Sequence, residues 1–294
     1  MVSETILNIK KLIDLSQRTA IVTGGAGLLG RTYTSALLQT GAKVIIIDKK
    51  IHENNTLKQI RKESDLDTKT LKNLKLIECD ITNNTKVKTI FQKLGPFLKD
   101  LKIVVNNASL VKQVGKESLV DSYKPFLRMD PSDWEEYFAV DLTGTLLISQ
   151  KCIPFMQKNG GGSIINISST YGILSPDQRL YKFFNDNLSQ KMKKLGVRIE
   201  KPIGYSISKS GTLNLTRFLA TKFAEYGIRV NTLTLGGVYD NNPPEFVKVY
   251  SERTPLGRMA NKKEYIGPLL FLASDMSSYM TGSNLIVDGG WSAW

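Results

Sequence analysis

The sequence contains very little histidine and cysteine. His52 is the only histidine in 294 residues, so a zinc site built on several histidines is excluded, and a Ser–His–Asp triad would depend on this one residue. The two cysteines, Cys79 and Cys152, form no metal or redox motif, and we expect both to be buried and reduced. We therefore expect no metal ion and no histidine-dependent hydrolase chemistry.

Long apolar runs are also missing. No stretch approaches the roughly 18 apolar residues that a membrane helix needs, and residues 1–15 mix charged with apolar residues, unlike a signal peptide. We expect residues 1–15 to form a short amphipathic extension of a cytoplasmic protein that binds no membrane. The net charge is +13, but the lysines are scattered along the chain. This pattern does not favour nucleic acid as a partner, whereas an anionic small molecule stays open.

A glycine-rich turn lies near the start of the chain. An apolar strand is predicted over residues 19–23, the sequence GGAGLLG occupies residues 24–30, and a helical pattern runs over residues 31–39. Such a turn lets the backbone approach a pyrophosphate and points a helix N-terminus at its negative charge. The turn alone could simply connect a strand to a helix.

Asp48 favours the cofactor interpretation of that turn. It ends a second apolar strand, predicted over residues 43–47, where a carboxylate can hydrogen-bond the ribose hydroxyls of an adenosine. Because it would also repel a 2′-phosphate, we expect NAD, with NADP less favoured. Lys49 and Lys50 keep NADP open, since either side chain could reach a phosphate.

Tyr205 and Lys209 lie four residues apart, which places both side chains on one face of a helix. A lysine charge near a phenol favours the phenolate, so we expect the tyrosine pKa to fall from about 10 toward the range useful for acid–base catalysis. The spacing alone is weak, because many surface helices contain such a pair.

Further motifs occur in a fixed order along the chain. Asp80-Ile81 and Asn106-Asn107-Ala108 each follow a predicted strand, Ser168-Ser169 follows the apolar strand at residues 163–167, and two apolar segments lie near Asn231 and Asp288. With the glycine turn and the Tyr205–Lys209 pair, this order resembles the short-chain dehydrogenase/reductase family over residues 16–294. The resemblance implies one α/β domain with a Rossmann-type doubly wound sheet of about seven mostly parallel strands.

The same resemblance implies an NAD(P)-dependent oxidoreductase acting on a secondary alcohol or ketone. It implies that Tyr205 exchanges the proton with the substrate oxygen, that Ser169 hydrogen-bonds this oxygen, and that Lys209 lowers the tyrosine pKa and holds the nicotinamide ribose. The cofactor residues that it implies are Thr23, Gly24, Gly27, Leu28, Leu29, Gly30, Asp48, Asp80, Ile81, Asn107, Ala108, Tyr205, Lys209, Gly236 and Val238. It also implies a homotetramer formed through the two long helices after the fourth and fifth strands, with a dimer as the alternative.

Three departures from the family pattern carry information. Leu28 replaces a glycine of the turn, Leu235 replaces a proline beside the nicotinamide, and Asp141 stands where the family has an asparagine that holds a relay water. Asp141, which we include among the catalytic residues, could support that water or form an ion pair with Lys209. The departures at Asp141 and Leu235 leave a catalytically silent NAD-binding protein as an alternative.

An inserted segment, residues 176–203, separates the catalytic serine from the tyrosine. It could fold over the substrate as a lid, with Arg179 as the first candidate for binding a substrate anion, or form a solvated helix. Its pattern PDQRLY at residues 176–181 resembles a bacterial subgroup linked to surface-sugar and flagellin-glycan synthesis, which favours a sugar-like substrate. A 3-oxoacyl-carrier-protein reductase is the alternative.

Overall fold

Seven parallel strands form one sheet in the computed structural model, which describes residues 8–111 and 126–294. The strand order is β3-β2-β1-β4-β5-β6-β7, so the direction of winding reverses between β1 and β4. This confirms the single Rossmann-type α/β domain. The strands are β1 (Thr19–Thr23), β2 (Lys43–Asp48), β3 (Leu74–Glu78), β4 (Leu101–Asn106), β5 (Gly162–Ser169), β6 (Ile228–Leu235) and β7 (Asn284–Val287).

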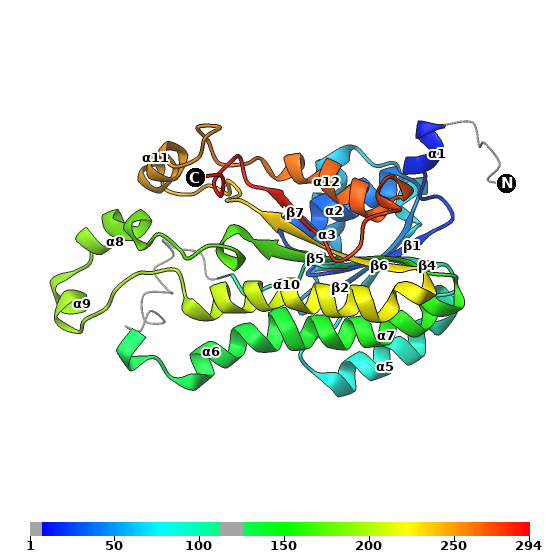
Figure 1. The fold of residues 1–294 in the computed structure, drawn as a ribbon, viewed down its shortest axis with the longest axis horizontal. Coiled ribbons are helices and arrows are strands. Elements are labelled where there is room, and N and C mark those ends of the chain that lie inside the picture. Colours follow the sequence, from blue (N-terminus) through cyan, green and yellow to red (C-terminus); the bar gives the residue numbers. More distant parts are fainter. Residues whose placement is uncertain (1–7, 112–125) are drawn as a thin grey trace.

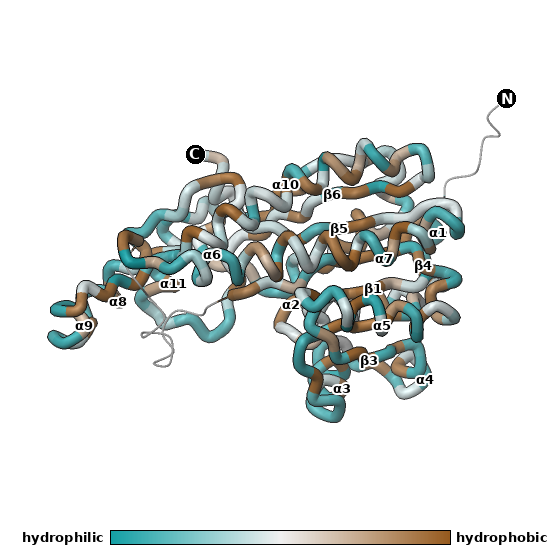
Figure 2. Tube along the Cα trace, turned by 90° about the horizontal axis from the view of Figure 1, so that it is seen from below, coloured by the Kyte–Doolittle hydropathy of each residue, from teal (hydrophilic) through white to brown (hydrophobic). Residues whose placement is uncertain are grey.

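Helices cover both faces of the sheet (Figure 1). On one face lie α2 (Leu28–Gln39), α3 (Glu53–Ser64) and α12 (Ile266–Ala273), and on the other lie α5 (Asn84–Leu94), α7 (Thr145–Lys158) and α10 (Ile203–Phe223). Successive strand residues alternate between the two layers: Val22 belongs to the first core and Ile21 to the second. Figure 2 shows these apolar strands enclosed by more hydrophilic outer segments such as α3 and α4. The remaining α-helices are α1 (Ile9–Ile13), α4 (Thr68–Leu71), α6 (Pro131–Phe138), α8 (Lys182–Asp186), α9 (Gln190–Lys194) and α11 (Pro244–Glu252).

The first strand and helix differ slightly from the sequence prediction. Strand β1 has the predicted bounds, but α2 begins at Leu28, three residues before the predicted helical pattern. Gly27 is its N-cap and provides no side-chain hydrogen bond. The glycine-rich segment, residues 24–30, therefore forms both the tight turn after β1 and the beginning of helix α2.

The inserted segment is packed onto the body of the protein. Its hydrophobic side chains, including Leu180, Tyr181 and Ile199, form a third cluster with Tyr250 of α11 and with Trp291. The side chain of Asn185 closes the segment on itself, because its amide donates to the carbonyl of Ile199 and its oxygen accepts from the N–H of the same residue. The short helices α8 and α9 project beyond the end of the sheet (Figures 1 and 2).

Candidate active site

The glycine turn brings the carboxyl ends of β1 and β4 into contact. Gly24 has a φ of +62°, and a Cβ there would lie 2.8 Å from the Cα of Ala108. The Asn107 amide donates to the carbonyl oxygens of Thr23 and Gly24 at 3.0 and 3.1 Å. The Thr23 hydroxyl in turn accepts the N–H groups of Asn107 and Ala108, both at 3.1 Å. Asn107 and Thr23 thus position the turn.

The turn also requires glycine at its end. A Cβ on Gly30 would lie 2.1 Å from the carbonyl oxygen of Gly24, so any side chain there would displace the backbone. The Asp48 carboxylate accepts the N–H of Ala26 at 3.0 Å, which holds this acidic group against the turn. Because Gly27 caps α2 without a side-chain bond, the first N–H groups of this helix are left for an anion. This backbone cradle with a carboxylate beside it fits a dinucleotide.

Other residues that the sequence predicts to bind the cofactor lie along the same edge of the sheet, and their side chains make different contacts. Asp80 follows β3, and its carboxylate accepts the hydroxyl of Thr82 at 2.7 Å. Ile81 is 6 % exposed and belongs to the core, so only its backbone can face a cofactor. Leu29, on the first turn of α2, packs against the other core.

Two further residues that the sequence predicts to bind the cofactor follow β6. Gly236 donates its N–H to the carbonyl of Val287 at 2.9 Å, and a Cβ on Gly236 would lie 2.8 Å from the Cα of Asp288. Val238 forms a parallel bridge with Ala260. Both positions therefore belong to an ordered connection beside the carboxyl end of β6, although leucine replaces the proline at position 235.

Ser169, Tyr205 and Lys209 meet at the carboxyl end of β5. Ser169 is the last residue of that strand, and α10 presents Tyr205 and Lys209 one turn apart. Lys209 is 4 % exposed, and its Nζ donates to the carbonyl oxygen of Ile167 at 3.0 Å and lies 5.9 Å from the centroid of the Tyr205 ring. Residues that are distant in sequence thus form one polar group.

The pKa of Tyr205 differs from the sequence expectation. The pKa of Tyr205 is raised to about 12: burial is the main cause, a hydrogen bond with the Ser169 side chain opposes it, and the negative charge of Asp141 adds to the rise. The sequence predicted a lowered pKa for Tyr205, and this prediction is wrong for the isolated protein. Removal from water disfavours the phenolate more than the nearby hydrogen-bond donors favour it. The site thus contains a phenol that holds its proton tightly.

Asp141 forms an ion pair with Lys209. It lies in a short π-helical turn (Ala139–Gly144) that connects α6 with α7, and it is 2 % exposed. One carboxylate oxygen lies 3.7 Å from the Nζ of Lys209, and the other accepts the hydroxyl of Ser208 at 2.6 Å. The sequence left two alternatives for Asp141, a water contact or an ion pair with Lys209. The structure contains the ion pair.

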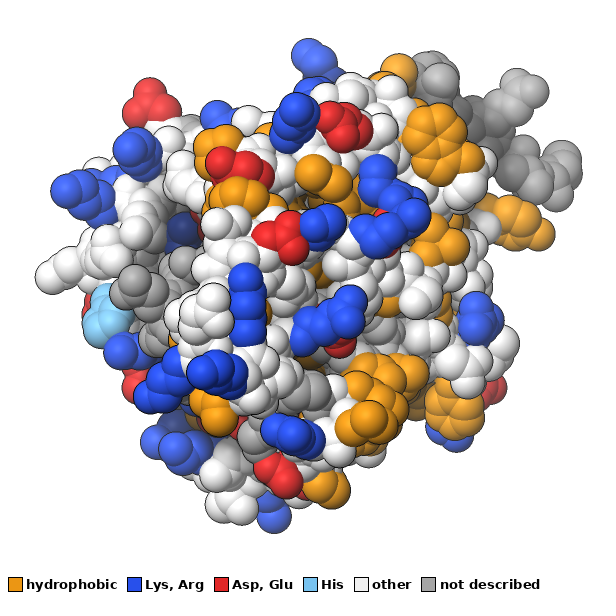
Figure 3. Space-filling model, turned by 90° about the vertical axis from the view of Figure 1, so that its left-hand side faces the viewer, with side chains coloured by type: hydrophobic (Ala, Val, Ile, Leu, Met, Phe, Trp, Pro, Cys, Tyr) orange, Lys and Arg blue, Asp and Glu red, His pale blue; other side chains and the backbone are white. Residues whose placement is uncertain are grey.

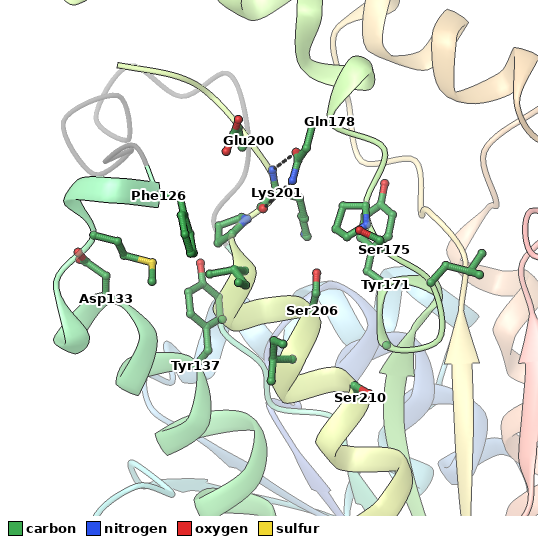
Figure 4. A pocket seen from close by; sticks show the side chains of 18 of the residues that line it. Phe126, Asp133, Tyr137, Tyr171, Ser175, Gln178, Glu200, Lys201, Ser206 and Ser210 are labelled. Carbon is green, nitrogen blue, oxygen red and sulfur yellow. Dashed lines mark hydrogen bonds between the residues drawn. The ribbon is translucent and has the colours of Figure 1, made fainter. Parts of the chain in front are cut away.

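A cavity of about 550 Å³ adjoins this group. Its walls come from α6, the N-terminal part of α10, residues 171–176 and residues 198–203, and Figure 4 shows Lys201, Tyr171 and Tyr137 around it. Ser169, Tyr205 and Lys209 do not line the cavity, but two of its wall residues contact the Tyr205 ring. The ring of Tyr137 meets it edge-on at 6.4 Å, and the Nζ of Lys201 lies 3.7 Å from its centroid.

The structure does not bring Arg179 to the cavity, and this corrects the sequence expectation. The Arg179 side chain is 80 % exposed, and its Nε and Nη2 donate to Asp177 at 2.9 and 3.0 Å. Lys201 of the same segment lies at the Tyr205 ring instead. Lys201 was not predicted from the sequence. The only sequence feature that could have indicated it is its position four residues before Tyr205.

The sequence also led to expectations about metal ligands, membrane helices, surface charge and the two cysteines. Within residues 8–111 and 126–294, no cluster of three or more His, Cys, Asp or Glu side chains is arranged to hold a metal ion. Over the same ranges no helix combines the length and apolar character needed to cross a membrane. On the face drawn in Figure 3, Lys and Arg side chains are interspersed with acidic and hydrophobic ones. Cys79 and Cys152 are both buried and unpaired, and burial raises the pKa of both thiols.

Comparison with known families agrees with this geometry. Residues 18–182 match the short chain dehydrogenase family, and residues 187–292 match a family described as enoyl-(acyl carrier protein) reductase. The chain belongs to the short-chain dehydrogenase/reductase family. It is an oxidoreductase of the NAD(P)-binding kind that acts on CH–OH groups.

Individual relatives are similar over nearly their full length. A ribulose-forming D-arabinitol 2-dehydrogenase of Scheffersomyces stipitis is 30% identical over 98% of this chain and 98% of its own. The post-translational flagellin modification protein A of Campylobacter coli is 29% identical over 94% and 99%. A crystal structure of a short chain dehydrogenase from Leptospira borgpetersenii serovar Hardjo-bovis with bound NAD+ has a TM-score of 0.78, with 29% identity and coverage of 98% and 97%.

Proposed function

We propose that the protein transfers a hydride between NAD and a secondary alcohol or ketone of a polar, sugar-like substrate. The observation that carries the proposal is the buried group of Ser169, Tyr205 and Lys209 beside the glycine cradle. Its parts come from β5, α10 and the β1 turn, and they adjoin a cavity large enough for a small polar molecule. The intact group also argues against a catalytically silent protein.

The nicotinamide, when bound, supplies the hydride donor or acceptor. Tyr205 exchanges a proton at the substrate oxygen, and the Ser169 hydroxyl hydrogen-bonds this oxygen as charge develops on it. The buried charge of Lys209 favours the phenolate form of Tyr205 and so opposes the effect of burial. The carbonyl of Ile167 and the carboxylate of Asp141 fix that lysine in place.

The position of Asp48 supports NAD over NADP. Its carboxylate is held at the turn by the N–H of Ala26, where a 2′-phosphate would meet its negative charge. The Nζ of Lys49 lies 3.8 Å from the carboxylate of Asp80. This lysine therefore has an acidic partner in the structure, which weakens its candidacy as a phosphate ligand.

A sugar-like substrate is supported by the polyol dehydrogenase among the relatives. The flagellin modification protein supports the more specific placement in a subgroup that makes surface sugars. A second candidate is reduction of the 3-oxo group of an acyl thioester on a carrier protein. The description of the family matching residues 187–292, an enoyl-(acyl carrier protein) reductase, supports the carrier-bound substrate but not the reacting group.

Exposed apolar side chains on two long helices support a homotetramer. Leu146 on α7 and Phe218 on α10 are exposed to 37 and 60 %. Burying such a surface between subunits would remove it from water. Light scattering of the purified protein would give the mass of the assembly.

A substrate screen tests the proposed function. The purified protein is incubated with NAD or NADP and a panel of pentitols and hexitols, and in the reverse direction with ketoses or an acetoacetyl-carrier-protein thioester. We expect oxidation of at least one polyol with NAD, abolished in Tyr205→Phe. Turnover of the thioester alone would support the carrier-protein reductase instead.

A further inference from the structure

We propose that Lys201 is a substrate-binding residue that selects substrates carrying a carboxylate near the reacting carbon. The proposal rests on the proposed function, since it concerns the same site. It starts from the position of the Lys201 Nζ, which lies 3.7 Å from the centroid of the Tyr205 ring and 5.9 Å from that of Tyr171. A cation that borders both the cavity and the catalytic ring can reach a group on a substrate held at Tyr205.

The backbone of Lys201 is fixed in this position. Its N–H donates to the side-chain oxygen of Gln178 at 2.8 Å, and its carbonyl accepts the side-chain amide of the same residue at 3.2 Å. The next residue, Pro202, is the N-cap of α10. Lys201 therefore joins the inserted segment to the catalytic helix, and little reorganisation is needed for it to bind a substrate.

The charges around Lys201 leave room for an anion. Among the described residues, no carboxylate lies within 4 Å of its Nζ and no acceptor hydrogen-bonds it. Of the acidic groups in the cavity wall, Glu200 pairs with Arg198 at 2.9 Å, and Asp133 accepts the N–H of Asp130 at 3.1 Å.

Two ammonium groups, those of Lys201 and Lys209, lie near the Tyr205 ring, and in the described part of the chain the only carboxylate paired with either of them is that of Asp141. The other titratable groups near this ring are the phenols of Tyr137, Tyr171 and Tyr250. At this ring, the ammonium groups therefore outnumber the carboxylates by one, while the cavity wall further out holds the pair of Arg198 and Glu200 and the carboxylate of Asp133. A carboxylate is the smallest common group that would balance this excess at the ring and accept hydrogen bonds from an ammonium.

The protonation of Lys201 gives the proposal a second readout. Burial and the charge of Lys209 lower the pKa of Lys201 to about 8, so it is mainly charged at pH 7 and mainly neutral at pH 9. Affinity for a carboxylate should therefore fall as the pH rises through about 8. Affinity for an uncharged polyol should not follow this titration.

Pairs of aldonates and alditols provide the test, with D-gluconate against D-glucitol and D-arabinonate against D-arabinitol as probes. Dissociation constants are measured by calorimetry on NAD-saturated protein in a Tyr205→Phe background, which stops turnover and keeps the ring beneath Lys201. We expect at least one aldonate to bind more tightly than its alditol at pH 7, and Lys201→Met to weaken that binding roughly 10- to 100-fold. Lys201→Arg should restore part of it, and Arg179→Met is the matched control, because its exposed guanidinium pairs with Asp177.

Two results would overturn the proposal: no aldonate preferred over its alditol, or a preference that Lys201→Met leaves unchanged. Either result leaves the proposed function standing if the protein with Tyr205 intact still oxidises an alditol with NAD. Failure of both NAD binding and turnover would instead count against the proposed function.

Discussion

Replacing Asp141 with asparagine should move the pH dependence of catalysis down by at least about one unit. The carboxylate disfavours the phenolate of Tyr205, so its removal should lower the pKa of this group. The Lys209 Nζ lies 3.7 Å from the Asp141 carboxylate and 5.9 Å from the Tyr205 ring centroid, so carboxylate and ring are at most about 10 Å apart. At that separation and an effective dielectric constant of about 20, a unit charge contributes about 1.7 kcal/mol, or roughly one pKa unit.

The sign of the shift follows from the role of Tyr205. In alcohol oxidation the phenolate accepts the proton, so the rising limb of kcat against pH should begin at lower pH in Asp141→Asn. In carbonyl reduction the phenol donates it, so the falling limb should move down as well. We expect turnover at the new optimum to be retained, and a lower thermal midpoint because Lys209 loses its buried partner.

The assay is a pH series of kcat and kcat/KM with NAD and whichever polyol the screen identifies. Ser208→Ala is the matched control, because it removes the hydroxyl that donates to Asp141 at 2.6 Å and keeps the carboxylate charge. An unchanged profile in Asp141→Asn, or an equal shift in Ser208→Ala, would refute the electrostatic reasoning. A folded but inactive Asn variant would show that the carboxylate has a further role.

Three other substitutions test the site. Tyr205→Phe keeps the ring and removes the transferable proton, so turnover should fall by roughly a hundredfold or more while the Kd for NAD changes little; near-normal turnover would remove Tyr205 from the mechanism. Asp48→Ala should raise the ratio of kcat/KM with NADP to that with NAD, because a repulsive charge is lost, and a wild-type preference for NADP would contradict this role. Gly30→Ala should abolish NAD binding in calorimetry or prevent folding, since its Cβ would lie 2.1 Å from the Gly24 oxygen, and an unaffected variant would show that the turn can shift.

Features that depend on neighbouring residues could be predicted from the sequence. Strand β1 has the predicted bounds, and the Tyr205–Lys209 pair lies on one helix, because strand and helix periodicity are local properties of the chain. The glycine turn was predictable for the same reason, since its residues are adjacent and their need for small size is steric. The order of these local motifs was sufficient to predict the fold and the family.

The tertiary structure decided how distant side chains interact. The pair between Asp141 and Lys209 joins segments that are far apart in sequence, and the sequence offered it only as one of two alternatives for Asp141. The sequence favoured Arg179 as the anion-binding residue of the inserted segment. Packing of this segment against α11 instead placed Lys201 at the Tyr205 ring, while Asp177 held Arg179 in solvent. The pKa of Tyr205 was expected to fall and instead rises, because its burial is set by the packing of the whole domain. Local sequence thus determined which groups are present, and packing determined their distances and dielectric surroundings.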